Sequence, residues 1–484
     1  MKNLIIYLTS FLINSAIVVA QQQQITPTSP NTAGLQKYID VPVSNHTGAA
    51  NFDIPIYVVK EGALSLPISL GYHSGGIKVS ELATWVGLGW NLNIGGVVTR
   101  QVKHLPDEGI SAPQQSRGWY RTGYILPDDI QVGFTNQAAD MTKDGSFGFT
   151  LDNVWTGESA ANGKFDCEPD VFSFNFNGYA GKFVYDDVYE RRMAEPDVSK
   201  RPVIEPIPHV FPLQDVLIKA QFIGEQSNLS VTGKFSYFTI TTADGTKYYF
   251  GDYNPEQDPN FVPAVEKTRS HIVGISAFLS QDSPTFESAD WIISAWYLVR
   301  IESADGKRVI KLKYTQERSG YYELGSQFRK LNEAGICGTD FADPTQSSTY
   351  LKLSKIAVKS VRLSQVVTAN ITVNFTANTL REDLNSDQQY NGNYDGNTEA
   401  KRLDAIEIQS NLTASCRKFV FDYGYFQENN VGGPEPLPAF YQTSSGYETN
   451  FGFADKKRLK LLSVQEMTCN GSLQIPKYQT LFRR

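Results

Sequence analysis

Residues 171–185 read VFSFNFNGYAGKFVY, and this stretch decides the fold class. Apolar and polar residues alternate from 171 to 176, and this period of two is typical of a strand with one buried face. Gly178 and Gly181 follow, and the apolar pattern returns in residues 182–185. Two short alternating runs separated by glycines predict a β-hairpin.

The same pattern recurs along the chain. Residues 237–241 and 247–250 flank Asp244 and Gly245, and an Asp-Gly pair supplies the positive φ angles that tight hairpin turns need. Four further hairpins are expected from residue 298 onward. Their leading leucines lie 55, 50 and 56 residues apart, at positions 298, 353, 403 and 459, and the returning strands are expected over 310–314, 371–375, 419–423 and 478–482.

A recurring spacing of this kind predicts degenerate repeats of one hairpin unit, although any all-β sequence can produce similar patterns. Each unit would bury one face, so neighbouring units must pair or stack to share a core. We therefore expect an all-β fold of extended antiparallel sheets built from successive hairpins, with degenerate repeats in the C-terminal half.

Composition supports a folded chain. The 484 residues are 41% hydrophobic and 20% charged, which excludes disorder as the main state. Lys and Arg number 44 against 51 Asp and Glu, a net charge of −7, so a nucleic-acid partner would need a local basic patch. The longest basic cluster, at 456–460, lies in a strand pattern and is expected to be a solvated face. No nucleic-acid partner is predicted.

The N-terminus predicts export. Residues 1–20 combine Lys2 with a short apolar run that ends in small residues, which is typical of a secretory signal peptide cleaved after Ala20. No later apolar stretch approaches the roughly twenty residues that cross a bilayer, so no integral membrane segment is expected after cleavage. The expected location is secreted or at the cell surface. The chain stops within an alternating strand pattern, which suggests a truncated reading frame.

The composition of the chain changes at a proline cluster. Prolines at 202, 206, 208 and 212 interrupt the strand pattern, since proline cannot enter a central strand. We expect a signal peptide (1–20), an N-terminal β region (21–200), a Pro-rich boundary with a hairpin segment (201–297) and degenerate hairpin repeats (298–484). Residues 381–400 are rich in Asn, Asp, Gln and Gly and predict a mobile surface loop.

Cysteines point to no metal or haem site. Cys167, Cys337, Cys416 and Cys469 form no CxxC pair. In an exported protein they could form up to two disulfides with three possible connectivities, and the sequence leaves open whether any forms.

A search for catalytic motifs fails. There is no GxSxG elbow, no phosphate-binding loop, no dinucleotide motif and no helical His pair for zinc. Three close carboxylate pairs could in principle cleave glycosidic bonds, but the pair at 168 and 170 is the one that could share a strand face, and a solvated strand entrance is the expected reading. A calcium-like run begins at Asp383 but lacks the required Gly and Glu positions. We predict no enzyme and no cofactor. The carboxylate pairs are Asp128 with Asp129, Glu168 with Asp170, and Asp186 with Asp187; the calcium-like run is Asp383, Asn385 and Asp387.

Residues 86–100, VGLGWNLNIGGVVTR, differ in kind from the rest. A Trp between two glycine pairs is typical of an anchor in a strand flanked by tight bends, where backbone crowding excludes side chains. The terminal Arg could cap a turn or pair across strands. The predicted structural motif comprises Gly87, Gly89, Trp90, Gly95, Gly96 and Arg100.

This segment resembles the N-terminal region of exported bacterial RHS/YD-repeat proteins, whose lead-in carries a GlGWnL stretch followed by GGxxxR. Residues 172–185, 244–251, 296–301 and 402–425 look similar to later blocks of that family, in the same order. The resemblance implies a large β-structure, and in longer members YD hairpins wind into a hollow shell that often encloses a C-terminal toxin. Here no run of Tyr-Asp-x-x-Gly repeats follows, so the match is to the lead-in.

The expected function is therefore a secreted or surface-associated, non-enzymatic structural module, the N-terminal part of an RHS-like protein. The alternatives are an extracellular glycan- or protein-binding β module and a carboxylate-dependent glycosidase. For the structural module and for the binding module, the expected partner is an unknown protein or glycan at the cell surface.

Overall fold

In a computed structural model, the chain is described over fourteen ranges, and its contacts group into two units. One unit is Met1–Ile25 with Val102–Pro169, and the other is Thr26–Gln101 with Asp170–Arg484, which holds every strand named below. The described residues are 50–74, 81–103, 106–107, 169–185, 207–223, 226–227, 230–231, 234–274, 291–330, 348–384, 400–413, 415–427, 457–472 and 478–479.

These residues contain strands and turns but no helix, so the predicted all-β fold of antiparallel hairpins is confirmed. The first strands are β1 (Ala50–Glu61), β2 (Leu64–Ser74), β3 (Trp90–Asn93), β4 (Gly96–Gln101), β5 (Val171–Phe176), β6 (Tyr179–Tyr185), β7 (Pro208–Phe211), β8 (Val216–Ile223), β9 (Gln226–Ser227), β10 (Ser230–Val231) and β11 (Lys234–Thr242). The others are β12 (Lys247–Gly251), β13 (Val265–Gly274), β14 (Ile292–Glu302), β15 (Val309–Lys330), β16 (Ser348–Val367), β17 (Ile371–Thr376), β18 (Ala405–Ser410), β19 (Cys416–Gln427), β20 (Lys457–Thr468) and β21 (Tyr478–Gln479).

The hairpin at 171–185 forms as predicted. β5 and β6 pair from Phe176 opposite Tyr179, and the two residues between them are Asn177 and Gly178. Both have positive φ, 45° and 88°. This is the turn geometry that matches the twist of paired strands, and Asn-Gly is the sequence that adopts it most readily.

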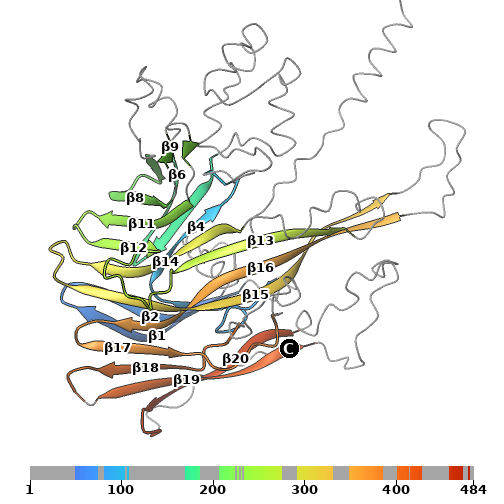
Figure 1. Ribbon diagram of the computed structural model, residues 1–484. Helices are drawn as coiled ribbons and strands as arrows, with labels where there is room; N and C mark the ends of the chain where they lie inside the picture. Colours follow the sequence, from blue (N-terminus) through green and yellow to red (C-terminus); the bar gives the residue numbers. More distant parts are fainter. Residues whose placement is uncertain are drawn as a thin grey trace, which may run out of the picture. The chain divides into compact units, whose positions relative to one another are not determined.

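The largest sheet branches at β14. Residues Ala295–Tyr297 pair with β4, while Leu298–Glu302 pair with β12, so the two halves of one strand belong to two different leaves. One leaf continues through β4, β5, β6 and β7, and the other through β12, β11 and β8. Figure 1 shows both leaves in the upper part of the ribbon.

An aromatic core joins the two leaves. Trp296 is fully buried at the branch, its ring 4.9 Å from Phe238 and 6.1 Å from Phe172, and its indole N–H donates to the Phe235 carbonyl at 3.1 Å. Because aromatic rings bury large apolar areas, this cluster holds the leaves face to face. Its other fully buried rings are Phe174, Phe176, Phe183, Tyr185 and Phe250.

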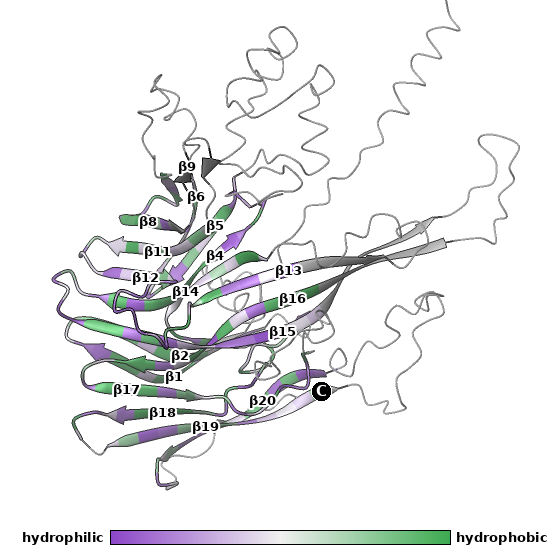
Figure 2. Ribbon diagram, in the orientation of Figure 1, coloured by the Kyte–Doolittle hydropathy of each residue, from purple (hydrophilic) through white to green (hydrophobic). Residues whose placement is uncertain are grey.

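The C-terminal half is a meander in which β16 to β21 are consecutive neighbours. Of the four hairpins predicted from residue 298, β14–β15 and β18–β19 are confirmed. In the second, β17 pairs with residues 365–367 of β16, while the predicted residues 353–358 pair with β13 and β15. In the fourth, β20 pairs with β21 at residues 463 and 464, and the predicted residues 480–482 lie outside the described residues. Apolar and polar positions alternate along β17, β18 and β19, as the colouring in Figure 2 shows. Of the four leading leucines, Leu298, Leu403 and Leu459 are fully buried.

A second, three-stranded sheet is formed by β1, β2 and β3. Alternate residues such as Ile54, Leu66 and Leu70 are buried, which gives the sheet one apolar face. Glu61, at the end of β1, is also buried and pairs with Arg308 at 3.0 Å while accepting from the Ala369 amide at 3.2 Å. The carboxylate thus ties this sheet to two hairpin turns of the large one.

The expected domain boundaries at 200/201 and 297/298 stay predictions. Strand pairing runs across both of them, because β6 pairs with β7 and β14 spans residues 292–302. The Pro-rich segment enters the structure as β7, whose described partner is β6 alone. Its place at the end of a leaf agrees with the exclusion of proline from central strands.

Candidate functional site

The predicted glycine and tryptophan motif lies in residues 81–100, here called the junction segment. Trp90 begins β3 in the small sheet, and Gly96 begins β4 in the large sheet. The motif is therefore the short connection through which the chain passes from one sheet to the other.

The first glycines let the junction segment approach the edge of β20. Gly87 has φ +114°, and a Cβ at this position would lie 3.0 Å from the Leu461 amide nitrogen. Next to it, the Leu88 amide donates to the Leu459 carbonyl at 2.8 Å, and Gly89 has φ +75°. Both φ values lie in the region that favours glycine, so the expected tight bends are present.

Trp90 is buried between the bends. Its ring lies 5.0 Å from that of Tyr72 at an interplanar angle of 51°, and Thr84 Oγ1 donates to the Trp90 carbonyl at 2.6 Å. The hydroxyl closes the loop from Thr84 to Trp90 and fixes where the indole enters the small sheet.

Gly95 and Gly96 make the second close approach. Gly95 has φ +77°, and its added Cβ would lie 3.1 Å from Leu312 Cδ2. At Gly96 an added Cβ would lie only 2.3 Å from Phe176 Cβ, the residue paired with it on β5. Glycine is required at position 96 because a side chain there would overlap the side chain of Phe176.

Arg100 carries the charge of the motif into the aromatic core. Its Nε and Nη2 lie 2.6 and 2.5 Å from Asp170 Oδ2, and both side chains are 0% exposed. The guanidinium carbon lies 5.6 Å from the ring centre of Phe172 and 5.7 Å from that of Phe235. A buried charge requires such a counter-charge and is favoured further by aromatic faces.

The expectation that Asp170 marks a solvated strand entrance is therefore wrong. Asp170 directly precedes β5, which pairs with β4, so the pairing register brings it to Arg100 from 70 residues away. The sequence offered a signal in the run GVVTR, where Arg ends a series of strand-forming residues. No feature of the sequence indicated which carboxylate would pair with Arg100.

A second buried pair anchors the other end of the junction segment. Arg381 Nε and Nη2 each lie 2.9 Å from one oxygen of Asp383, and Nη2 also donates to the Ala83 carbonyl at 2.9 Å. Asp383 Oδ2 in turn accepts from the Leu459 amide at 2.8 Å. The pair thus joins the junction segment to the outer edge of β20.

This arrangement corrects one expectation for residues 381–400 and bears on the calcium-like run. Arg381 and Asp383 are buried, so the predicted surface loop is wrong at its start. Both oxygens of Asp383 are already bonded to Arg381, which leaves the calcium-like run without its first ligand. Asn385 and Asp387 lie outside the described residues.

The basic cluster also departs from a purely solvated face. Lys457 pairs with Glu382, and Arg458 Nε donates to the Glu81 carbonyl at 3.0 Å. Arg458 thereby adds a third contact between β20 and the junction segment. Lys456 lies outside the described residues.

Two buried glutamates on the large sheet were not anticipated from the sequence. Glu317 lies 3.3 Å from Arg362 Nη1, and burial raises its pKa although Arg362 and Arg381 act in the opposite direction. Glu266 is fully buried and accepts from the hydroxyls of Tyr297 at 3.0 Å and Ser360 at 2.8 Å. For Glu266 the available signal was an acidic residue directly after apolar strand residues; Glu317 lies among polar residues, which gave no such signal.

Burial likewise controls the ionisation of nearby groups. It raises the pKa of Tyr423, which keeps the phenol neutral beside Arg402 and Asp404. For Arg381, burial is the largest single influence and would lower the pKa, but the charge and hydrogen bonds of Asp383 together with the charge of Glu317 raise it. The Arg381–Asp383 pair is internal, which suits a role in anchoring the junction segment.

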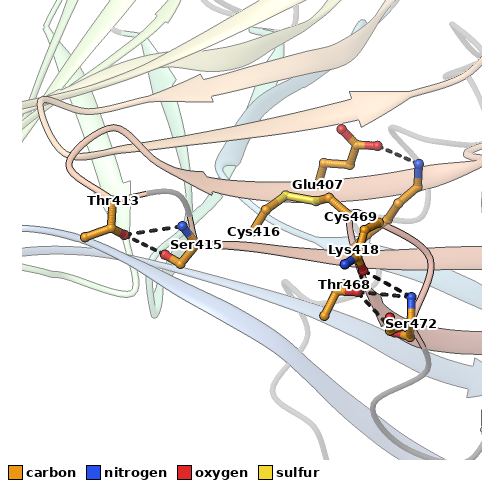
Figure 3. Close-up of a disulfide and its surroundings, with 9 residues drawn as sticks. Glu407, Thr413, Ser415, Cys416, Lys418, Thr468, Cys469 and Ser472 are labelled. Atoms are coloured by element: carbon orange, nitrogen blue, oxygen red, sulfur yellow. Dashed lines mark hydrogen bonds and ion pairs between the residues drawn. A yellow bond between two sulfur atoms is a disulfide. The ribbon is translucent and has the colours of Figure 1, made fainter.

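Two of the four cysteines form a disulfide, which answers the question that the sequence left open. Cys416 begins β19 and Cys469 directly follows β20, with 5.7 Å between their Cα atoms. Figure 3 shows the bond beside the Lys418–Glu407 ion pair, whose charged atoms are 2.6 Å apart. Cys167 and Cys337 lie outside the described residues.

The other candidate carboxylates and the signal-peptide residues 1–20 lie outside the described residues. These carboxylates are Asp128, Asp129, Glu168, Asp186 and Asp187. Within the part that is described, no group of three or more His, Cys, Asp or Glu side chains could hold a metal ion. That part also contains no helix with the length and apolar character to span a bilayer.

Neither the protein-family models nor the curated proteins searched gave a match to the chain.

Proposed function

We propose that the chain is a secreted or surface-associated, non-enzymatic structural module that corresponds to the lead-in of an RHS-like protein. In this proposal its task is to hold β-sheets in a fixed arrangement for a partner or for further β-structure at the cell surface.

The use of the buried charges supports this proposal most. Arg100 bonds to Asp170 from 70 residues away, and the buried Arg381–Asp383 pair bonds to Ala83 and to Leu459. Glu61 is buried and pairs with Arg308, whose side chain is 56% exposed, from a different sheet. A catalytic site needs ionisable groups that face a substrate, whereas these groups face one another across the fold. The motif that carries the family resemblance lies between two of these pairs.

The disulfide supports the proposed export. Disulfides form and persist in oxidising compartments, and they are rare in the reducing cytosol. A bond between Cys416 and Cys469 therefore fits a protein that leaves the cell through the predicted signal peptide.

Export is tested by expressing the full chain with a C-terminal tag in a bacterial host and fractionating the cells. The mature protein is expected outside the cytoplasm with Gln21 as its first residue, read by N-terminal sequencing. An uncleaved product confined to the cytoplasm would refute the exported role.

The lead-in role is tested by co-expressing the chain with a YD-repeat segment from an RHS protein and purifying through the tag. The two are expected to co-purify. A chain carrying Trp90→Ala serves as the matched control, because its junction segment loses the indole that anchors it. Recovery of the chain alone, with the YD-repeat segment well expressed, would contradict this role.

A protein-binding module is the second candidate. The surface around β7 and β8 has apolar side chains in solvent, with Leu213 93% exposed, Leu217 57% and Phe211 43%. Exposed apolar groups near strand edges favour protein contacts. Glycan stacking receives less support, because Phe211 is the exposed aromatic among residues whose side chains are described. Crosslinking with an aryl azide at Leu213→Cys, compared with Leu412→Cys, would identify a protein partner or rule out this surface.

A further inference from the structure

The disulfide closes the open end of a long strand pair. β19 and β20 pair from Gln427 opposite Lys457 to Arg417 opposite Thr468, and the disulfide joins the next residue on each strand. At the other end, the two strands are connected by the 29 residues 428–456. A connection of this length holds a register weakly, since many conformations of the chain compete with the one that closes it.

The outer edge of β20 has one short strand neighbour among the described residues. Among the described residues, β21 pairs with Ser463 and Val464. Nearer the start of β20, Leu459 bonds instead to Leu88 and to Asp383. β19 to β21 lie at one end of the sheet, and elements at the edge of a sheet are among those that open locally at low free energy.

The same strand carries the junction segment. The Leu459 carbonyl accepts from the Leu88 amide at 2.8 Å, and Arg458 donates to the Glu81 carbonyl at 3.0 Å. An added Cβ on Gly87 would touch the Leu461 amide, so the segment also fits closely against this edge. If β20 separates from β19, the junction segment loses the surface to which it is bonded.

We propose that the Cys416–Cys469 disulfide is a redox-sensitive latch that keeps β20, and through it the junction segment, on the sheet. Cys469 is exposed and half-buried Cys416 lies beside it, so a thiol reagent can reach the bond. A dithiol reductant attacks one sulfur, the S–S bond breaks, and a second exchange releases both protein thiols as the reductant becomes a disulfide. Oxidation by a small-molecule disulfide reverses these steps, and that disulfide takes up the two electrons.

Amide hydrogen exchange measured by mass spectrometry tests the latch. In the Cys416→Ser/Cys469→Ser protein, exchange in residues 457–468 and 81–90 is expected to rise tenfold or more. Exchange in 171–185 and 235–250, which belong to the aromatic core, should change less than twofold. A Cys167→Ser/Cys337→Ser protein is the matched control and should show wild-type exchange in all four regions.

Two results would overturn the proposal. Unchanged exchange in both 457–468 and 81–90 would show that the disulfide does not hold the edge. An equal rise in all four regions would show a general stabiliser in place of a local latch. If the double variant does not fold, the folded wild type is treated with dithiothreitol and then with oxidised glutathione. The same local rise should appear on reduction and disappear on reoxidation, and its absence would refute the latch.

Discussion

At the scale of single residues, two ion pairs are buried within the fold. Arg100 and Asp170 are both inaccessible to solvent, and Arg381 and Asp383 are 1% exposed. Two charges removed from water repay their desolvation only when geometry is good, so each pair is sensitive to loss of one partner. The neighbouring glycines act differently, since each permits a close backbone approach that a side chain would block.

Replacing Asp170 by Asn should lower the free energy of unfolding by about 3–5 kcal/mol, because the Arg100 charge stays buried without its counter-charge. Urea unfolding at pH 7 measures the change. Lys311→Ala is the control, because its pair with Glu256 is solvent-exposed and should contribute less than about 1 kcal/mol. Equal losses in the two variants would contradict the importance of burial.

Gly96→Ala should destabilise the protein by about 1–3 kcal/mol through overpacking, since the new methyl group would meet Phe176 at 2.3 Å. Gly178→Ala is the matched control: φ is +88° there, but no atom lies within 4 Å of the added carbon. Its loss should be near 1 kcal/mol and arise from the backbone alone. Gly178→Asn should recover part of that loss, whereas Gly96→Asn should be worse than Gly96→Ala.

At the scale of elements, one turn is used three times. The turn occurs at Thr242–Gly245, at Ser303–Gly306 and at residues 468–471. All three share the pattern Ser/Thr, small residue, Asp/Asn, Gly. In each, the glycine has φ between 71° and 90°, and its amide donates to the carbonyl of the Ser or Thr at 2.8–3.0 Å. The Ser or Thr hydroxyl also donates to the Asp or Asn side chain. A common local turn explains why successive hairpins could be read from the sequence.

Acid should weaken the first of these turns. The Thr242 hydroxyl and the Thr246 amide donate to Asp244, and these bonds lower its pKa below the ordinary value of 3.8. A carboxyl with a lowered folded pKa stabilises the protein above its unfolded pKa, and this contribution is lost as pH falls through the folded pKa. Melting temperatures of wild type and Asp244→Asn should therefore differ most well above pH 3.8, and the difference should shrink as pH falls below 3.8. A difference that does not change with pH would contradict this role of the charge.

At the largest scale, β14 connects the two leaves and the C-terminal meander within the unit that holds the strands. Its two halves pair with different leaves, Trp296 lies between them, and the meander from β16 to β21 continues from its hairpin with β15. The small sheet is tied to this body at Glu61 and again through the junction segment. Loss of packing at the branch should therefore spread, while loss at β20 should stay local.

Trp296→Ala should lower the free energy of unfolding by about 3–5 kcal/mol, because it leaves a cavity where both leaves meet. Hydrogen exchange should rise in 171–185 and in 235–250 together. Trp291→Ala is the control, since that ring is half-buried and contacts Lys359 Nζ at 4.0 Å, and its loss should be smaller. Faster exchange in one leaf alone would show that the leaves are not joined through Trp296.

The sequence by itself determined the all-β class, the hairpins and the glycine-dependent bends of the junction segment. Those features depend on alternation and turn residues within about twenty positions of one another, so local chemistry encodes them. Tertiary structure alone decided that Asp170 answers Arg100, that Asp383 binds Arg381 and the edge of β20, and that Cys416 bonds to Cys469. Each of the contacts to Arg100, the β20 edge and Cys416 joins residues 53 to 76 positions apart, and strand register, which no local pattern specifies, brings them together.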